Sequence, residues 1–242
     1  AWDAAYVPRN EQFTAAPPTG AALTRWKYQA YMQDYLRCVK ALDDNIGRVL
    51  DELTAQGLDR NTVVIYASDQ GFYNGEHGWF DKRWMYEESL QMPLMVRWPG
   101  VVKPGTRAQP MVQNIDYAPT LCEIAGVKTP GDRHGVSFAP ILRGVTPSDW
   151  RTSIYYHYYE FPADHRVQAH VGVRTDRYKL IYYYPVNQWE LFDLQADPHE
   201  MTSVYGRPDY AGVQAILTSE LDRLRKLYHE KSYATVPAPS AR

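Results

Sequence analysis

The sequence has little of several features that would assign it to a specialised class of protein. Only two of its 242 residues are cysteine, Cys38 and Cys122, which excludes a disulfide framework. No apolar run approaches the roughly 20 residues that a helix needs to cross a bilayer. Lys and Arg number 26 against 28 Asp and Glu, a net charge of −2. This balance excludes a protein whose affinity depends on neutralising nucleic acid phosphates. We therefore expect neither a membrane span nor a nucleic acid partner.

Aromatic residues are the one marked excess, with 20 Tyr, 7 Trp and 6 Phe making up 14% of the chain. Tyr and Trp combine an apolar ring face with a polar tip. Such side chains suit polar, ring-shaped ligands, and they suit wet protein interfaces as well. Both cysteines fall in apolar helical patterns, so we expect them to be small buried hydrophobes.

The first part of the chain has the pattern of an α/β domain. Apolar residues recur at steps of three and four from about residue 24 to 56, which predicts a helix with Gly57 as its left-handed cap. The continuous β-branched run at 63–67 is typical of a strand buried on both faces, as in a parallel sheet. A second strand is predicted at 94–98, and a helix at 117–125 has Asp116 as its N-cap. Helix, short loop and buried strand indicate part of a doubly wound α/β fold.

The character of the sequence changes after Gly144. Short, Tyr-rich, alternating segments at 154–159, 171–174 and 178–184 predict antiparallel strands, and 214–228 predicts an amphipathic helix. We therefore predict two domains, an α/β part over residues 1–147 and a small α+β subdomain over residues 148–242. His157 and His165 of the second part are expected in surface loops.

Polar residues directly follow the first predicted strand, where ligands bind in open α/β sheets. Asp69 and Gln70 place a carboxylate beside an amide oxygen, which suits a hard cation such as Ca²⁺. Lys82, a dozen residues on, can supply positive charge to an oxyanion. The same residues also fit an ordinary loop, because Asp is a common turn former, and His77 and Lys82-Arg83 suit a solvated surface. Spacing alone leaves both interpretations open.

A series of short motifs decides between them, because they run in order along nearly the whole chain and resemble the C-terminal half of a type I sulfatase. They are Asp43-Asp44-Asn45-Ile46-Gly47, Ser68-Asp69-Gln70-Gly71, Gly75-Glu76-His77-Gly78, Asp81-Lys82-Arg83, Asn114-Ile115-Asp116-Tyr117, Gly172-Val173-Arg174-Thr175 and Glu190-Leu191-Phe192-Asp193.

The resemblance implies an alkaline-phosphatase-like fold, with part of a mixed or parallel sheet flanked by helices and a small C-terminal subdomain with an antiparallel sheet. Members of this family hydrolyse sulfate esters or sulfamates. Their nucleophile is a formylglycine made from the Cys or Ser of a Cys/Ser-x-Pro-x-Arg motif. One divalent cation, Ca²⁺ rather than Mg²⁺, binds beside it.

Carried over by position, the resemblance makes Asp69 and Gln70 metal ligands. It makes Lys82 the group that contacts the sulfate and neutralises charge on the bridging oxygen, and gives His77 a substrate-side catalytic role. Three further residues are candidate substrate contacts: Arg83, His170 and Arg174. Since an amide oxygen is a poor zinc ligand and a reasonable calcium ligand, Gln70 favours a sulfatase over the zinc-dependent phosphatases of the same superfamily.

The nucleophile has no counterpart in the sequence, because neither cysteine and no serine begins a Cys/Ser-x-Pro-x-Arg motif. We therefore expect the chain to be the C-terminal portion of a sulfatase. It would be inactive alone and complete only with an N-terminal half, as the start at Ala1 also suggests.

Two other interpretations stay open. The chain is a non-catalytic module that binds an anionic glycan or a protein, or it belongs to a phosphodiesterase or phosphonate hydrolase of the same superfamily. For a sulfatase, the resemblance favours a sulfated glycan over an aryl sulfate as the partner. It implies a periplasmic, secreted or lysosomal location for the whole enzyme.

Overall fold

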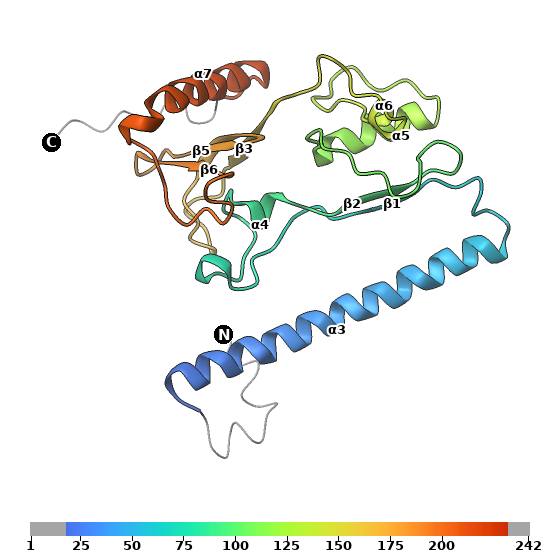
Figure 1. Cartoon of the computed structure of the whole chain (residues 1–242), viewed down its shortest axis with the longest axis horizontal. Coiled ribbons are helices and arrows are strands. Elements are labelled where there is room, and N and C mark those ends of the chain that lie inside the picture. Colours follow the sequence, from blue (N-terminus) through green and yellow to red (C-terminus); the bar gives the residue numbers. More distant parts are fainter. Residues whose placement is uncertain (1–17, 232–242) are drawn as a thin grey trace. The chain divides into compact units, whose positions relative to one another are not determined.

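The computed structural model describes residues 18–231, coloured along the chain in Figure 1. These residues form two compact units. The first comprises residues 18–62 and 74–79, and the second comprises residues 63–73 and 80–231. The predicted domain boundary at 147/148 lies inside the second unit and stays a prediction. None of the helices within residues 18–231 is long and apolar enough to span a membrane.

The first unit is dominated by the helix α3 (Gly20–Ala55), 36 residues long, in the region where apolar periodicity predicts one. Gly57 follows it with φ +67°, the left-handed cap that was predicted. No side chain of α3 is buried, so the expectation that Cys38 is buried is wrong: it is exposed. Its apolar neighbours Leu36, Val39 and Leu42 are exposed as well. A 3-10 turn, η2 (Glu76–Gly78), completes this unit.

The second unit begins with the strand β1 (Val64–Ala67), which pairs with β2 (Leu94–Arg97). The pairing is antiparallel, with Val64 opposite Arg97 and Ala67 opposite Leu94. Among residues 18–231 this is the pairing that β1 makes. The strand is not buried on both faces as expected, because three of its residues are half-buried and Ala67 is exposed. The chain between the strands turns back through the short helix α4 (Glu87–Leu90) instead of crossing over through a long one.

Three short helices follow β2, and Asp116 serves them differently from the prediction. It precedes α5 (Tyr117–Ile124) as expected, but its side chain makes no capping hydrogen bond to that helix. The carboxylate is fully buried, accepts the backbone N–H groups of Gln113 and Val136, and pairs with Arg151. Asp116 therefore fastens several segments together. The other two helices are η3 (Asn114–Asp116) and α6 (Ala139–Leu142); Cys122, on α5, is half-buried.

The Tyr-rich part forms a four-stranded antiparallel sheet in the order β3-β4-β5-β6, with α7 lying along it (Figure 1). The antiparallel strands and the final helix were predicted, whereas β6 was not. The elements of the Tyr-rich part are β3 (Ser153–Tyr158), β4 (His170–Thr175), β5 (Tyr178–Tyr183), β6 (Gln188–Asp193), η4 (Pro208–Tyr210) and α7 (Ala211–Leu227).

The two faces of this sheet pack against different partners because successive side chains of a strand point to opposite faces. Val171 and Val173 join Leu217 and Leu221 of α7 in a buried core. His170 directly precedes Val171 and so points to the opposite face, where it stacks on Trp84. The segment that leads into α4 therefore packs on the face opposite α7, and this contact positions the candidate site.

Candidate active site

The loop after β1 holds the two predicted metal ligands, and their side chains differ in freedom. Asp69 is exposed, whereas Gln70 is half-buried. The Gln70 amide nitrogen Nε2 donates to both the backbone oxygen and the hydroxyl of Ser89, each at 2.8 Å. Asp69 and Gln70 thus offer two adjacent oxygen donors, one exposed and one hydrogen-bonded to α4.

Gly71 brings this loop close to α4. Its N–H donates to the Ser89 backbone oxygen at 2.9 Å. A Cβ at this position would lie 2.0 Å from the backbone oxygen of Glu88, far inside contact distance. Only glycine therefore fits, and its presence allows Gln70 to reach Ser89.

Lys82 and Arg83 lie on the segment that leads into α4. Lys82 is exposed, and its backbone oxygen accepts the Ser89 hydroxyl at 2.7 Å. Arg83 pairs with Asp81 at 2.5 Å, while its backbone oxygen accepts the Tyr156 hydroxyl at 2.9 Å. The backbone under the candidate lysine is therefore held from both α4 and β3.

His77 belongs to the first unit. It lies inside η2 with φ 55° and stacks on Trp79, with 5.7 Å between ring centroids. Its predicted catalytic role stays a prediction.

A pocket of about 360 Å³ in the second unit joins the predicted ligands to the Tyr-rich sheet. Asp69 and Gln70 form part of its wall. Lys82, Arg83, His170 and Arg174 are not among the lining residues. The other polar and aromatic lining side chains are Ser89, Gln113, Asn114, His134, Tyr155, Tyr156, His157, Tyr159, Tyr228 and Glu230.

His157 is a wall residue of this pocket, so its expected place in a surface loop is wrong. Its side chain is only 2% exposed. Nδ1 lies 2.9 Å from the Glu230 carboxylate, and the Tyr184 hydroxyl lies 3.2 Å from Nε2. Burial lowers the pKa of His157 despite that carboxylate, which favours the neutral ring at pH 7. The alternating pattern of residues 154–159 already placed His157 in a strand and could have indicated its burial. His165 is exposed in a loop, as expected.

His170 and Arg174 have their contacts with the segment at α4. His170 is fully buried, donates from Nδ1 to the Gln168 backbone oxygen at 2.7 Å, and stacks on Trp84. Arg174 pairs with Glu87 of α4 at 3.2 Å. These contacts join the two residues to the rest of the fold, and their role as substrate contacts stays a prediction.

Acidification is expected to destabilise the protein through His170. Burial lowers its pKa from 6.5 to about 4, so between those pH values the unfolded state binds the proton and the folded state does not. The free energy of unfolding then falls as pH drops from 6.5 to 4, by up to about 3 kcal/mol for this one group. Denaturation at pH 7 and pH 4.5 should show a flatter pH dependence for His170→Phe, and an unchanged one for the exposed control His165→Ala. An equal slope in His170→Phe would contradict the assignment.

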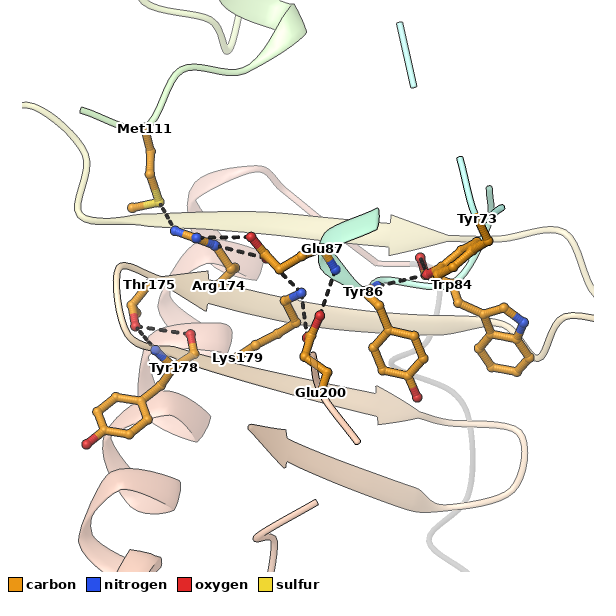
Figure 2. A network of polar contacts seen from close by, with 10 residues as sticks. All are labelled: Tyr73, Trp84, Tyr86, Glu87, Met111, Arg174, Thr175, Tyr178, Lys179 and Glu200. Atoms are coloured by element: carbon orange, nitrogen blue, oxygen red, sulfur yellow. Dashed lines mark hydrogen bonds and ion pairs between the residues drawn. The ribbon is translucent and has the colours of Figure 1, made fainter. Parts of the chain in front are cut away.

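A buried ion network that was not predicted joins α4 to the sheet (Figure 2). Lys179 of β5 is fully buried, with Nζ 2.8 Å from the Glu87 carboxylate and 2.7 Å from that of Glu200. Glu200 also accepts the backbone N–H of Glu87 at 2.7 Å. Burial favours the neutral form of both carboxyls. At Glu87 the positive charges of Lys179 and Arg174 outweigh burial, so the pKa lies below its ordinary value. At Glu200 burial outweighs the charge of Lys179, so the pKa lies above its ordinary value.

The donor set at the loop suits a hard cation but supplies only part of its coordination. No group of three or more His, Cys, Asp or Glu side chains suited to a metal gathers within residues 18–231. Asp69 and Gln70 contribute two oxygen donors, whereas Ca²⁺ takes six to eight. These two residues therefore fit one side of a calcium site, without the imidazole or thiolate that zinc prefers.

Comparison with known proteins decides the family. The family model described as Sulfatase matches residues 3–127, and the model described as N-sulphoglucosamine sulphohydrolase, C-terminal, matches residues 75–227. The chain belongs to the sulfatase family.

Its similarity extends to individual sulfatases over less than half of their length. It is 47% identical over 232 residues to an N-acetylglucosamine-6-O-sulfatase of Bacteroides thetaiotaomicron, covering 95% of this sulfatase chain and 42% of the relative. It is 32% identical to a choline-sulfatase of Rhizobium meliloti, covering 78% of this chain and 36% of that protein.

Solved structures place the fold in the same superfamily. One, described as a complex with its substrate D-glucosamine-2-N,6-O-disulfate, matches with a TM-score of 0.91 and 45% identity, over 98% of this sulfatase chain and 48% of the other. A phosphonate monoester hydrolase of Agrobacterium radiobacter matches with a TM-score of 0.70 and 26% identity, over 77% and 39%. The alkaline-phosphatase-like α/β fold predicted from the sequence is thereby confirmed.

Proposed function

We propose that this chain is the C-terminal portion of a calcium-dependent sulfatase that hydrolyses the 6-O-sulfate ester of a glucosamine residue in a glycan. The observation that carries the proposal is that Asp69, Gln70 and residues of the Tyr-rich sheet line the same pocket. The 47% identity to an N-acetylglucosamine-6-O-sulfatase supports the choice of substrate. The small subdomain then supplies the sugar contacts, and the α/β part supplies the charge.

The Asp69 carboxylate and the Gln70 amide oxygen would hold the cation. When bound, Ca²⁺ stabilises negative charge on the sulfate oxygens. The exposed Lys82 ammonium neutralises the charge that develops on the bridging oxygen as the ester bond breaks, which is where fixed positive charge accelerates such a reaction. The remaining oxygen ligands would come from elsewhere in the enzyme.

The aromatic wall suits a pyranose ring. Tyr155, Tyr159 and Tyr228 line the pocket, and tyrosine side chains bind surfaces that are partly apolar and partly polar. His157 and Glu230 are coupled by a 2.9 Å contact, which orients the imidazole. They would hydrogen-bond the sugar hydroxyls and so select the glycan.

The nucleophile of the proposed reaction lies outside these 242 residues, since they contain no Cys/Ser-x-Pro-x-Arg motif. We propose that an N-terminal half of the same enzyme supplies a formylglycine there. Without a nucleophile the ester cannot be displaced, so this portion alone is expected to be inactive.

A phosphonate or phosphodiester hydrolase is the second candidate, because the fold also matches a phosphonate monoester hydrolase. The Gln70 amide beside Asp69 argues against it, since phosphoryl-transfer members of the superfamily with zinc sites need nitrogen ligands. The two candidates act on different central atoms, sulfur in a sulfate ester and phosphorus in a phosphonate or phosphate ester. Assays with both kinds of substrate therefore distinguish them.

The deciding experiment measures inorganic sulfate release from N-acetylglucosamine 6-sulfate by the complete protein, beside a phosphonate monoester and a phosphodiester. We expect sulfate release by the complete protein and none by the 242-residue portion. Hydrolysis of the phosphorus esters alone would establish the second candidate. Glycan binding without hydrolysis of any of the three would favour a non-catalytic module.

Asp69→Asn is expected to weaken Ca²⁺ binding by on the order of tenfold or more, because the number of charged ligands sets calcium affinity. Isothermal titration of the complete protein with Ca²⁺ measures the dissociation constant directly. Asp164→Asn, at an exposed loop position outside the pocket, is the matched control and should bind as the wild type does. Equal affinities in all three proteins would remove Asp69 from the ligand set.

A further inference from the structure

We infer that Ser89 is the positioning residue that turns the oxygen of the Gln70 amide, rather than its nitrogen, toward the cation. This inference rests on the proposed function, in which Gln70 is a metal ligand. Ser89 lies in α4 and is fully buried. Its side chain is small and uncharged.

The hydrogen bonds around Ser89 leave only one orientation for the amide. Its backbone oxygen can only accept, and it already accepts the Gly71 N–H at 2.9 Å. Its hydroxyl carries a single hydrogen, which is donated to the Lys82 backbone oxygen at 2.7 Å. Toward Gln70 both Ser89 oxygens can therefore only accept, and both lie 2.8 Å from Nε2.

A reversed amide would place its oxygen against two acceptors and lose two hydrogen bonds. Such a reversal is unfavourable, because hydrogen bonds lost in a buried site are not replaced by water. The amide is therefore locked with Oε1 on the side away from Ser89. This matters to a cation because an amide oxygen is a ligand for Ca²⁺, whereas an amide NH₂ group presents hydrogens to it.

The same hydroxyl links the two functional halves of the site. It holds the Gln70 amide on one side and the Lys82 backbone on the other, so the predicted metal ligand and the predicted sulfate-binding lysine share one buried anchor. The anchor is itself fixed, since the neighbouring Glu87 is fastened to Lys179 and Glu200 (Figure 2). Through Ser89, both the Gln70 amide and the Lys82 backbone are held at a defined position relative to the sheet.

The test is a double-mutant cycle on Ca²⁺ affinity, measured by isothermal titration of the complete protein. Ser89→Ala is expected to weaken binding by on the order of 10-fold or more, the usual effect of removing a group that orients a metal ligand. In a Gln70→Ala background, Ser89→Ala should weaken binding no further, because the residue through which it acts is gone. Ser153→Ala is the matched control, since Ser153 is a buried serine that hydrogen-bonds Glu220 instead, and it should leave affinity unchanged.

The outcomes separate this inference from the proposed function. If Gln70→Ala weakens binding but Ser89→Ala does not, or if their effects add in the double variant, the positioning role is overturned while the calcium site stands. If the wild type shows no calcium binding, or Asp69→Asn and Gln70→Ala leave affinity unchanged, the metal assignment and this inference fail together. Should Ser89→Ala unfold, Ser89→Cys retains the side-chain volume with a much weaker hydrogen-bonding atom, and the same loss of affinity is expected of it.

Discussion

Lys82→Ala is expected to lower the kcat of the complete protein on N-acetylglucosamine 6-sulfate by on the order of 100-fold or more, comparable to losing an oxyanion donor. The lysine is exposed, while its backbone is held through the Ser89 hydroxyl. The charge is therefore presented on a fixed anchor and is needed only when the bridging oxygen becomes negative. Its loss should appear in kcat and in kcat/KM by similar factors, the sign of an interaction made in the transition state.

Sulfate release at saturating substrate measures this effect, with Lys128→Ala as the control. Lys128 is an exposed lysine of the same unit that does not line the pocket, so its removal should leave kcat unchanged. Lys82→Ala should also keep the wild-type denaturation midpoint, because an exposed side chain contributes little to folding. A raised KM with an unchanged kcat would mean that Lys82 binds the sulfate without assisting the reaction, and unchanged kinetics would remove it from the mechanism.

The local elements of the fold were predictable because their signals are local. Apolar steps of three and four determine α3, and the position of Gly57 marks its end. Alternation in the Tyr-rich segments determines β3, β4 and β5. The direction in which β1 pairs was not predictable from its apolar run, because such a run specifies burial and not which strand lies beside it.

Candidate ligands were found where the chain itself places them together, as with Asp69 and Gln70 directly after β1. What the sequence could not reveal is which face of the sheet is covered and by what. His157 and His170 lie on the neighbouring strands β3 and β4, whose residues alternate between the two faces of the sheet. Only the packing of α4 and of the loop at Glu230 determines that both histidines are buried. Ser89 and Gln70 are 19 positions apart, so no spacing rule joins their side chains.

Lys179 is the strongest example, because a lysine in the Tyr-rich strand β5 has the pattern of a solvent-facing residue. It is fully buried instead, since Glu87 and Glu200 approach it from distant parts of the chain. A charge can be buried in this way only when opposite charges accompany it. Its burial is thus a property of the assembled fold and not of the strand.

Lys179→Met is accordingly expected to lower the free energy of unfolding by about 3–5 kcal/mol, the usual result of removing one partner from a buried ion pair. Methionine keeps most of the length and volume of the lysine stem, so the loss isolates the charge. Glu87 and Glu200 would then face each other with Arg174 as the one cation paired with Glu87 in the network of Figure 2. Denaturation of the complete protein at pH 7, followed by Trp fluorescence, measures the change, and the exposed Lys226→Met of α7 is the control.

The pH dependence of the variant distinguishes lost charge from lost packing. Without Lys179 the pKa values of both buried carboxyls rise, so the folded state binds protons more readily than the unfolded state. The free energy of unfolding of Lys179→Met should then recover relative to the wild type as pH falls from 7 toward 5. Adding Glu87→Gln and Glu200→Gln should restore much of the stability at pH 7, because replacing a whole buried ionic group is far less costly than breaking it. A deficit that does not change with pH, and that the added glutamines do not relieve, would mean that Lys179 stabilises the fold through packing alone.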